Sequence, residues 1–292
     1  MPTELNSTAT EASARLPHLH TLDVRVERRI AWVTINHEPI NLMDATLVGE
    51  LDQLVDWLAE QGDSVRVVIF QSAVPDFFLA HLDLDLIQTT IDDPDPDAAL
   101  ESFQGLVTRY RQLDQVAIAK VAGRVGGGGS EFLLNLDLRF AVRDRAVFNQ
   151  FETGLGILPA GSGSQHLPRL LGRGRALEVI LGHDDVDADI AERYGWVNRT
   201  FDAASIDAFI DRLASRIATQ PLWLLAAAKR AADALVPSFQ HGLELEREAS
   251  RAAFAAPEPR ALIADFLARG GQTESGERRL AELLSELTAS DR

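Results

Sequence analysis

The spacing of apolar residues in the first two thirds of the chain alternates between strand-like and helix-like patterns. Short apolar or alternating runs predict strands at residues 22–26, 30–35, 65–70, 116–122, 138–142 and 146–148. From Asp44 onward, apolar residues recur at helical spacing, and Gln61-Gly62 ends that predicted helix. Runs that are apolar throughout are typical of strands buried on both faces. This part of the chain therefore predicts an α/β core.

From residue 203 onward the periodicity is helical only. Apolar stripes predict helices within residues 206–217, 222–235, 243–254, 260–267 and 280–287. Alternating strands and helices followed by helices alone predict a mixed core with a helical C-terminal region. We divide the chain into a disordered tail (1–20), an α/β core (21–202), a helical region (203–270) and an extra C-terminal helix (271–292).

Composition narrows the classes of protein that fit these patterns. The 292 residues are 46% hydrophobic and 25% charged, as in ordinary globular proteins. No apolar run reaches about 18 residues, and the first 19 residues lack the apolar stretch of a signal peptide, so we expect no membrane association. The absence of cysteine suits a cytoplasmic protein. The net charge of −16 argues against a nucleic-acid partner.

Four consecutive glycines, residues 126–129, follow a predicted strand and precede a helix predicted to begin near Ser130. They do not form a phosphate-binding P-loop, because no Gly-Lys-Ser/Thr follows, nor a dinucleotide motif, because Glu131 replaces its third glycine. Helix N-termini present unpaired N–H groups, and glycine lets a ligand approach the backbone closely. The run therefore predicts an oxyanion site; the alternative is a tight strand–helix junction without a ligand.

A second candidate group, Glu152, lies between a predicted short strand and the glycine-rich loop 154–163. Alone it could be a surface carboxylate, but Glu131 and Glu152 beside an oxyanion site would form a general acid/base pair. The acidic stretch 83–101 is predicted to centre on an exposed loop. Histidines and carboxylates do not occur at metal-ligand spacing, so we expect no metal site.

Several of these segments, in chain order, resemble the crotonase superfamily, also called the enoyl-CoA hydratase/isomerase family. The similar stretches are residues 36–41, 78–84, 122–131, 148–152, 154–159, 167–176 and 191–198. The resemblance runs from about Leu22 to about Gly270. Several ordered motifs at the right spacing are more specific than any one of them.

The resemblance implies a spiral of ββα repeats, with residues 203–270 as a region that drives formation of a homotrimer or a hexamer. It also implies an acyl-CoA thioester substrate, so that coenzyme A arrives as part of the substrate and no separate cofactor is needed. The thioester oxygen would be held by the backbone N–H groups of Leu82 and Gly128, and Glu131 and Glu152 would be the catalytic residues. The substrate-binding positions that it implies are Ala80, His81, Asp83, Gly127 and Pro159.

The sequence departs from the family pattern at three places. His81 replaces the glycine that usually precedes the first oxyanion donor, and Pro159-Ala160 replaces the usual Pro-Gly. The lysines that often pair with coenzyme A phosphates are missing; Arg28, Arg29 or Arg269 could substitute, or the acyl group could arrive on a carrier protein.

These departures leave alternative activities open. The leading hypothesis is a hydratase that adds water to a 2-enoyl thioester. Another crotonase reaction, such as double-bond isomerisation, thioester hydrolysis or a biosynthetic step, is the second hypothesis, because function depends on the site rather than on the fold. A non-catalytic oligomeric binding protein is the third.

Overall fold

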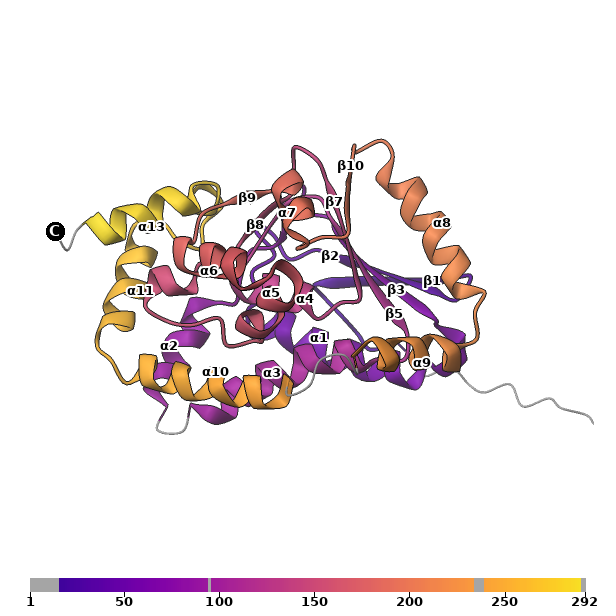
Figure 1. The fold of residues 1–292 in the computed structure, drawn as a ribbon, viewed down its shortest axis with the longest axis horizontal. Coiled ribbons are helices and arrows are strands. Elements are labelled where there is room, and N and C mark those ends of the chain that lie inside the picture. The colour runs from indigo at the N-terminus through magenta and orange to yellow at the C-terminus, as the bar shows by residue number, and fades with distance from the viewer. Residues whose placement is uncertain (1–15, 94–95, 234–238, 290–292) are drawn as a thin grey trace, which may run out of the picture.

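The strands form two sheets in the computed structural model, which describes residues 16–93, 96–233 and 239–289 (Figure 1). The order in the six-stranded sheet is β1 (Leu22–Glu27), β2 (Ile30–Ile35), β3 (Val67–Ser72), β5 (Val116–Val121), β7 (Leu138–Val142) and β10 (Arg199–Phe201). The order in the four-stranded sheet is β4 (Phe77–Leu79), β6 (Arg124–Gly126), β8 (Val147–Asn149) and β9 (Val186–Asp187). Among the strands that the structure describes, the β1–β2 and β8–β9 pairs are antiparallel and the other pairs are parallel.

From β3 to β8, consecutive strands alternate between the two sheets, and helices connect each couple of strands to the next. The couples of consecutive strands, one strand in each sheet, are β3 with β4, β5 with β6, and β7 with β8. They are followed by α2 (Leu84–Asp92) and α3 (Asp97–Gln112), by α4 (Gly127–Leu134), and by α5 (Gly163–Leu171) and α6 (Arg173–Gly182). The predicted spiral of ββα repeats is therefore confirmed. Because the strands are parallel, their carboxyl ends lie at one edge of each sheet, and the loops and helices that follow them meet there.

Helices cover both faces of the six-stranded sheet, as Figure 1 shows for α8 (Ile206–Ala218) on one side and α1 (Ala45–Glu60) with α3 on the other. Side chains of a strand alternate between faces. Thus Ile69 packs with the α8 cluster and Phe70 with the larger core cluster. The remaining helices are α7 (Ala188–Tyr194), α9 (Leu222–Asp233), α10 (Phe239–Phe254), α11 (Glu258–Ala268), α12 (Glu274–Glu277) and α13 (Leu280–Ala289).

The C-terminal helices α11 and α13 pack against the part of the core that follows β8. Their buried residues share one apolar cluster with Phe151 and Leu155, which lie in and beside the short 3-10 helix Glu152–Leu155. The extra C-terminal segment thus packs on the segment that begins with Glu152. Among the described residues, no helix has the length and apolar character that crossing a bilayer requires.

The structure differs from the predicted elements at several places. The strand predicted at 65–70 begins two residues later, and the helix predicted from Ser130 begins already at Gly127. The centre of the acidic stretch 83–101 is exposed at Asp92 and Asp93, as predicted, but α2 and the start of α3 flank it. Asp83 caps α2 through the N–H of Asp85, and Leu84, Ile91 and Leu100 are buried. Burial of one face of each helix stabilises helices on both sides of the predicted loop.

Four predictions fall partly outside the described residues. The structure does not describe the first 15 residues of the predicted tail, residues 94–95 of the acidic stretch, residues 234–235 of the helix predicted within 222–235, or residues 290–292 of the C-terminal segment. At the end of the predicted tail, the N–H of His20 donates to Glu50 Oε1 at 2.7 Å, so the chain is already tied to α1 before β1 begins.

Candidate active site

The glycines at the start of α4 and just before it let the chain pass very close to the backbone of the neighbouring repeat. A Cβ added at Gly123 would lie 2.5 Å from the backbone of Asp76 and Phe77, and one at Gly129 would lie 2.6 Å from the carbonyl oxygen of Leu79. Real side chains do not approach backbone so closely, so these two positions require glycine. Part of the run therefore serves strand–helix packing, the alternative that the sequence left open, and this packing fixes where α4 begins.

The direction of the Leu82 N–H is set by a single bridge to Met43. The N–H of Met43 donates to the His81 carbonyl at 2.9 Å, and the N–H of Asp83 donates to the Met43 carbonyl at 3.1 Å. In a planar trans peptide the C=O and N–H point in opposite directions. Because the His81 carbonyl faces Met43, the Leu82 N–H of the same peptide faces away from it.

Gly128 faces Leu82 from the start of α4. A Cβ added at Gly128 would lie 2.8 Å from Leu82 Cβ and 3.3 Å from Leu82 N. Gly128 is in the first turn of α4, whose N–H groups have no partner within the helix. The backbones of residues 82 and 128 thus pass each other closely, and both residues line the same cavity.

Glu131 enters this cavity from α4 and is 3% exposed. Its Oε1 accepts the N–H groups of Gly161 at 2.7 Å and of Gly163 at 2.8 Å. Ser162, between these glycines, has a φ of 91°, which side-chain-bearing residues rarely adopt and which aims both glycine N–H groups at one oxygen. Burial, with the negative charges of Glu152 and Glu246, raises the pKa of Glu131 well above its ordinary value.

Glu152 enters the cavity from the segment after β8 and is 8% exposed. Its Oε1 accepts from Gln150 Nε2 at 2.8 Å, whereas its buried Oε2 has no hydrogen-bond partner among the described residues. Burial raises the pKa of Glu152 to about 7. A buried carboxylate oxygen without a protein partner is suited to hold a water molecule or a substrate proton.

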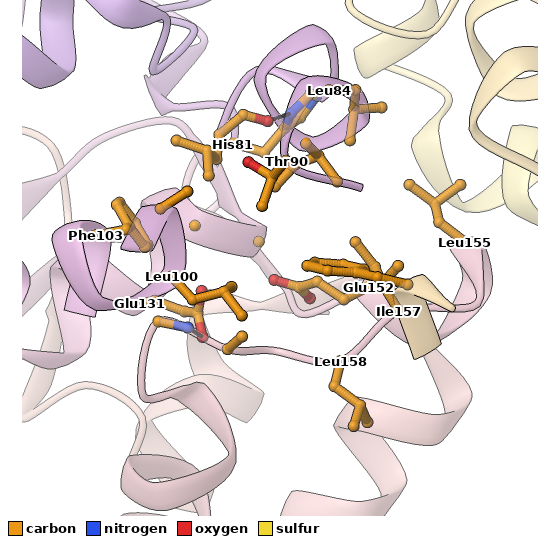
Figure 2. Close-up of a pocket in the computed structure, with 18 of the residues that line it drawn as sticks. His81, Leu84, Thr90, Leu100, Phe103, Glu131, Glu152, Leu155, Ile157 and Leu158 are labelled. Atoms are coloured by element: carbon orange, nitrogen blue, oxygen red, sulfur yellow. Dashed lines mark hydrogen bonds between the residues drawn. The ribbon is translucent and has the colours of Figure 1, made fainter. Parts of the chain in front are cut away.

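The rest of the cavity wall is mostly apolar, as Figure 2 shows around the two glutamates. The apolar residues come from α2, α3, α10 and the segment after β8: Leu84, Ile87, Leu100, Phe103, Phe151, Leu155, Ile157, Leu158 and Phe254. Two carboxyl groups and two backbone donors at one end of an apolar cavity can hold a polar reacting group whose tail is a hydrocarbon chain.

The predicted substrate-binding residues divide into two sets. His81 and Gly127 line the cavity with the four predicted catalytic and oxyanion residues. Ala80, Asp83 and Pro159 are not among its lining residues: Asp83 caps α2, Ala80 packs in a small apolar cluster, and Pro159 is buried beside Gly163. These three shape the backbone around the cavity.

Two buried carboxyl groups that sequence reasoning missed lie next to the predicted site. Glu246 of α10 accepts from the N–H of Ser162 at 3.0 Å and from Ser164 Oγ at 2.5 Å. His81 Nε2 lies 3.2 Å from Oε1 of Glu277 in α12. Glu246 lies in a predicted helix, where an acidic residue among apolar ones was the available signal. The four residues of α12 have no apolar face, so no sequence pattern pointed to Glu277.

Comparison with known proteins places this arrangement in a family. The family model described as enoyl-CoA hydratase/isomerase matches residues 25–266. A Mycobacterium bovis protein named "probable enoyl-CoA hydratase echA8" is 30% identical over 249 residues, which are 85% of this chain and 95% of that protein. The fatty acid oxidation complex subunit alpha of Aliivibrio fischeri is 30% identical over 195 residues, or 66% of this chain, and the match spans 28% of that longer protein.

A solved structure agrees with the sequence matches. The structure from Streptomyces avermitilis described as a "putative enoyl-CoA hydratase" superposes with a TM-score of 0.85 at 37% identity, covering 93% of this chain and all of that one. The ββα spiral, the family match over most of the chain and these relatives agree with one another. The chain belongs to the enoyl-CoA hydratase/isomerase family, the crotonase superfamily.

Proposed function

We propose that this protein is a hydratase that adds water across the double bond of a 2-enoyl thioester. One observation carries the proposal: two buried glutamates, Glu131 and Glu152, share an otherwise apolar cavity with the facing backbones of Leu82 and Gly128. Membership in the family supports a crotonase-type enzyme and is consistent with an acyl-CoA substrate. The choice of hydration among the family's reactions rests on the two glutamates.

The two backbone donors supply the electrostatic part of the reaction. When water adds to C3 of a 2-enoyl thioester, negative charge develops on the thioester oxygen. The N–H groups of Leu82 and Gly128 would bind that oxygen more strongly as an enolate than as a ground-state carbonyl, which is the difference that accelerates a reaction. Their positions are fixed before substrate binds, by the Met43 bridge and by the start of α4.

The glutamate pair supplies the proton transfers. Hydration requires one group that takes a proton from water and one that delivers a proton to C2. Two buried carboxyl groups repel each other when both are ionised, so the pair keeps a proton to higher pH than exposed carboxyl groups do and passes through a state with one proton as the pH rises. A pair with one proton contains both the base and the acid that the reaction needs, and water held by both carboxyl groups would be positioned for attack.

Three further proposals concern the carrier, the assembly and the location. The arginines that could replace the missing lysines are already paired: Arg28 with Asp211, Arg29 with Asp63, and Arg269 with Asp265. Because these arginines are paired and the net charge is −16, the protein offers little positive charge to the phosphates of coenzyme A. An acyl carrier protein should therefore be tested as the carrier beside coenzyme A. We further propose a homotrimer or a hexamer in the cytoplasm.

The test offers short and medium 2-enoyl thioesters on each carrier and follows the enone absorbance together with free thiol and product mass. Hydration predicts loss of absorbance, a product heavier by one water, and no free thiol. Release of thiol would show thioester hydrolysis, an unchanged mass with a moved double bond would show isomerisation, and no reaction with any thioester would favour a binding protein. Each of these three outcomes contradicts the proposal.

A further inference from the structure

His81 is buried beside the predicted oxyanion site, at the position where the family usually has glycine. Its side chain is surrounded by protein, and the residue is 1% exposed. The imidazole packs edge-on against Phe151, with ring centroids 5.3 Å apart. Its Nδ1 lies 2.8 Å from the carbonyl oxygen of Leu82, and its Nε2 lies 3.2 Å from Glu277 Oε1. Both ring nitrogens therefore have partners.

The chemistry of these partners determines where the ring carries protons. The Leu82 carbonyl can only accept a hydrogen bond, so Nδ1 must carry a proton. Glu277 Oε1 also accepts the N–H of Gln272 at 2.7 Å, which favours the ionised carboxylate because a donated hydrogen bond stabilises its negative charge. An ionised Glu277 is acceptor-only, so Nε2 must carry a proton as well. An imidazole with both nitrogens protonated is an imidazolium cation.

The segment that supplies Glu277 is tied at further points to the loop that carries the oxyanion donor. Gln272 Oε1 accepts the N–H of Leu84 at 2.6 Å, and Gln272 Nε2 donates to Asp83 Oδ1 at 2.9 Å. Together with the Glu277–His81 contact, these bonds attach residues 272–277 to residues 81–84. The family match ends at residue 266, so this attachment is made by a segment outside the matched region.

We infer that His81 is an imidazolium held by Glu277 and that it is a positioning residue of the active site: it holds the carbonyl of Leu82, the residue whose N–H is the oxyanion donor, and supplies a positive charge beside Glu152 and the developing enolate. This inference rests on the proposed function for its kinetic consequences, although the charge state does not. The C-terminal segment then acts as part of the site, since it provides the counter-charge without which a buried cation is costly.

The charged groups that face this pair support the assignment. His81 faces Glu277 from α12 and Glu152 from the segment after β8, while Arg124 of β6 acts on Glu277. Burial alone would lower the pKa of His81, but Glu277, the Leu82 carbonyl and Glu152 outweigh it and raise that pKa. Burial alone would raise the pKa of Glu277, but the charge of His81 holds it below its ordinary value. His81 in turn lowers the pKa of Glu152 against the effect of burial.

The charge state can be measured without any reaction. In the full-length protein labelled with ¹⁵N-histidine, the ring resonances lost in His81→Gln belong to His81. We expect both nitrogens to be protonated at pH 7.5, above the ordinary histidine pKa of about 6.5, and we expect that state to be lost in Glu277→Gln. A neutral ring at this pH in the unmodified protein would overturn the inference, whatever the enzyme catalyses.

The effect of the His81 charge on catalysis is measured by the pH profile of kcat/KM on the thioester that the enzyme hydrates. His81→Gln keeps a hydrogen-bond donor but removes the charge, and Glu277→Gln removes the counter-charge. In both variants we expect the acidic limb to move to higher pH by about 1 unit, because a nearby cation lowers a carboxyl pKa by about that amount or more. Glu274→Gln, an exposed glutamate of the same helix paired with Arg278, is the matched control and should keep the wild-type profile.

Profiles of His81→Gln and Glu277→Gln that superpose on the wild type would overturn the functional part of the inference. Thermal melts of both variants check that they are folded. If the unmodified enzyme does not hydrate any thioester, the proposed function fails, but the ring spectra still decide the charge state, so the two failures are distinguishable.

Discussion

Glu131 and Glu152 differ in what holds them, although both line one cavity. Two backbone N–H groups fix one oxygen of Glu131, whereas Glu152 has a single side-chain donor and an oxygen without a described protein partner. The first carboxyl group is therefore rigidly placed, and the second is open toward whatever occupies the cavity. This asymmetry suits a pair in which the carboxyl groups exchange one proton with water and substrate.

The identity of these two residues could be predicted from the sequence, but their partners could not. Glu131 and Glu152 stand out because each lies beside a glycine-rich segment. The N–H groups of Gly161 and Gly163 converge on Glu131 only because Ser162 takes a left-handed backbone conformation that the sequence does not encode locally. Sequence reasoning finds the reactive groups more easily than the backbone donors that orient them.

The oxyanion site predicts the effect of a methyl group at position 128. In Gly128→Ala the new Cβ would lie 2.8 Å from Leu82 Cβ and would push the two backbones apart. We expect kcat to fall by about 10²-fold or more, the scale for loss of one oxyanion donor. The measurement is kcat on the hydrated thioester, with circular dichroism to show that the fold is kept.

Gly105→Ala in α3 is the matched control, since a Cβ there meets nothing within 4 Å. It should leave kcat unchanged and, as a helix-interior glycine, raise the free energy of unfolding by up to about 1 kcal/mol. Wild-type turnover in Gly128→Ala would show that residue 128 does not face the reacting oxygen.

At the scale of elements, α13 supports the segment that carries Glu152. Leu284 is fully buried, and its Cδ2 would lie 3.2 Å from a Cβ added at Gly154 in the short 3-10 helix. We expect Leu284→Ala to lower the free energy of unfolding by about 2–5 kcal/mol, the range for buried leucines. Because Glu152 is in that 3-10 helix, kcat should fall too.

Urea unfolding and kcat measured on the same preparations test this prediction. Leu181→Ala removes a leucine that is 62% exposed and serves as the control, with an expected change within about 0.5 kcal/mol. If Leu284→Ala has the stability and turnover of the control, α13 does not support the site.

Glu246 predicts how stability depends on pH. Burial raises its pKa to about 7, above the ordinary value of 4.5 that applies to the unfolded chain. With rising pH the unfolded chain therefore ionises first, so the favourable contribution of protonated Glu246 is complete below about pH 4.5 and is lost as pH approaches 7. The loss amounts to about 3 kcal/mol at 1.36 kcal/mol per pKa unit.

In Glu246→Gln this titration is removed, so the fall of unfolding free energy between pH 5 and 7 should be shallower than in the wild type. Glu244→Gln, an exposed glutamate of α10, should keep the wild-type slope. Urea unfolding at several pH values and one protein concentration gives both slopes. Parallel curves for Glu246→Gln and the wild type would refute the assignment.

For the whole molecule, the order of strands and helices was largely predictable, whereas contacts between distant segments were not. Apolar runs located β2, β5 and β7 because they are buried on both faces. The helices α2 and α3 were not predicted, because their buried apolar faces are narrow and the composition around Asp92 is acidic. The contact between His81 and Glu277 joins residues that are 196 positions apart in the sequence, and a local sequence pattern cannot predict such a contact.

The expected assembly depends on surfaces that the single chain leaves exposed. Ile263 and Phe266 of α11 are fully buried within the chain itself, and the ring of Phe266 stacks on Phe151 with centroids 6.3 Å apart. A charge at Phe266 would therefore disrupt this core rather than probe an interface. Trp223 on α9, 69% exposed, is a better candidate for a contact between chains.

We expect sedimentation at micromolar concentration to give the mass of three or six chains. Trp223→Asp should shift the distribution toward single chains, because a buried charge at an interface is costly. A wild-type protein that sediments as a single chain would contradict the proposed trimer. An unchanged mass in Trp223→Asp would place this residue outside the interface.

Joint hydration of an enoyl thioester by Glu131 and Glu152 can be tested through kcat of the two glutamine variants. Glutamine is nearly isosteric with glutamate, so Glu131→Gln and Glu152→Gln should stay folded while each loses one partner in proton transfer. We expect each substitution to lower kcat for hydration by at least about 10²-fold. A variant of either glutamate that stays folded and keeps near wild-type kcat on the same thioester would contradict this expectation.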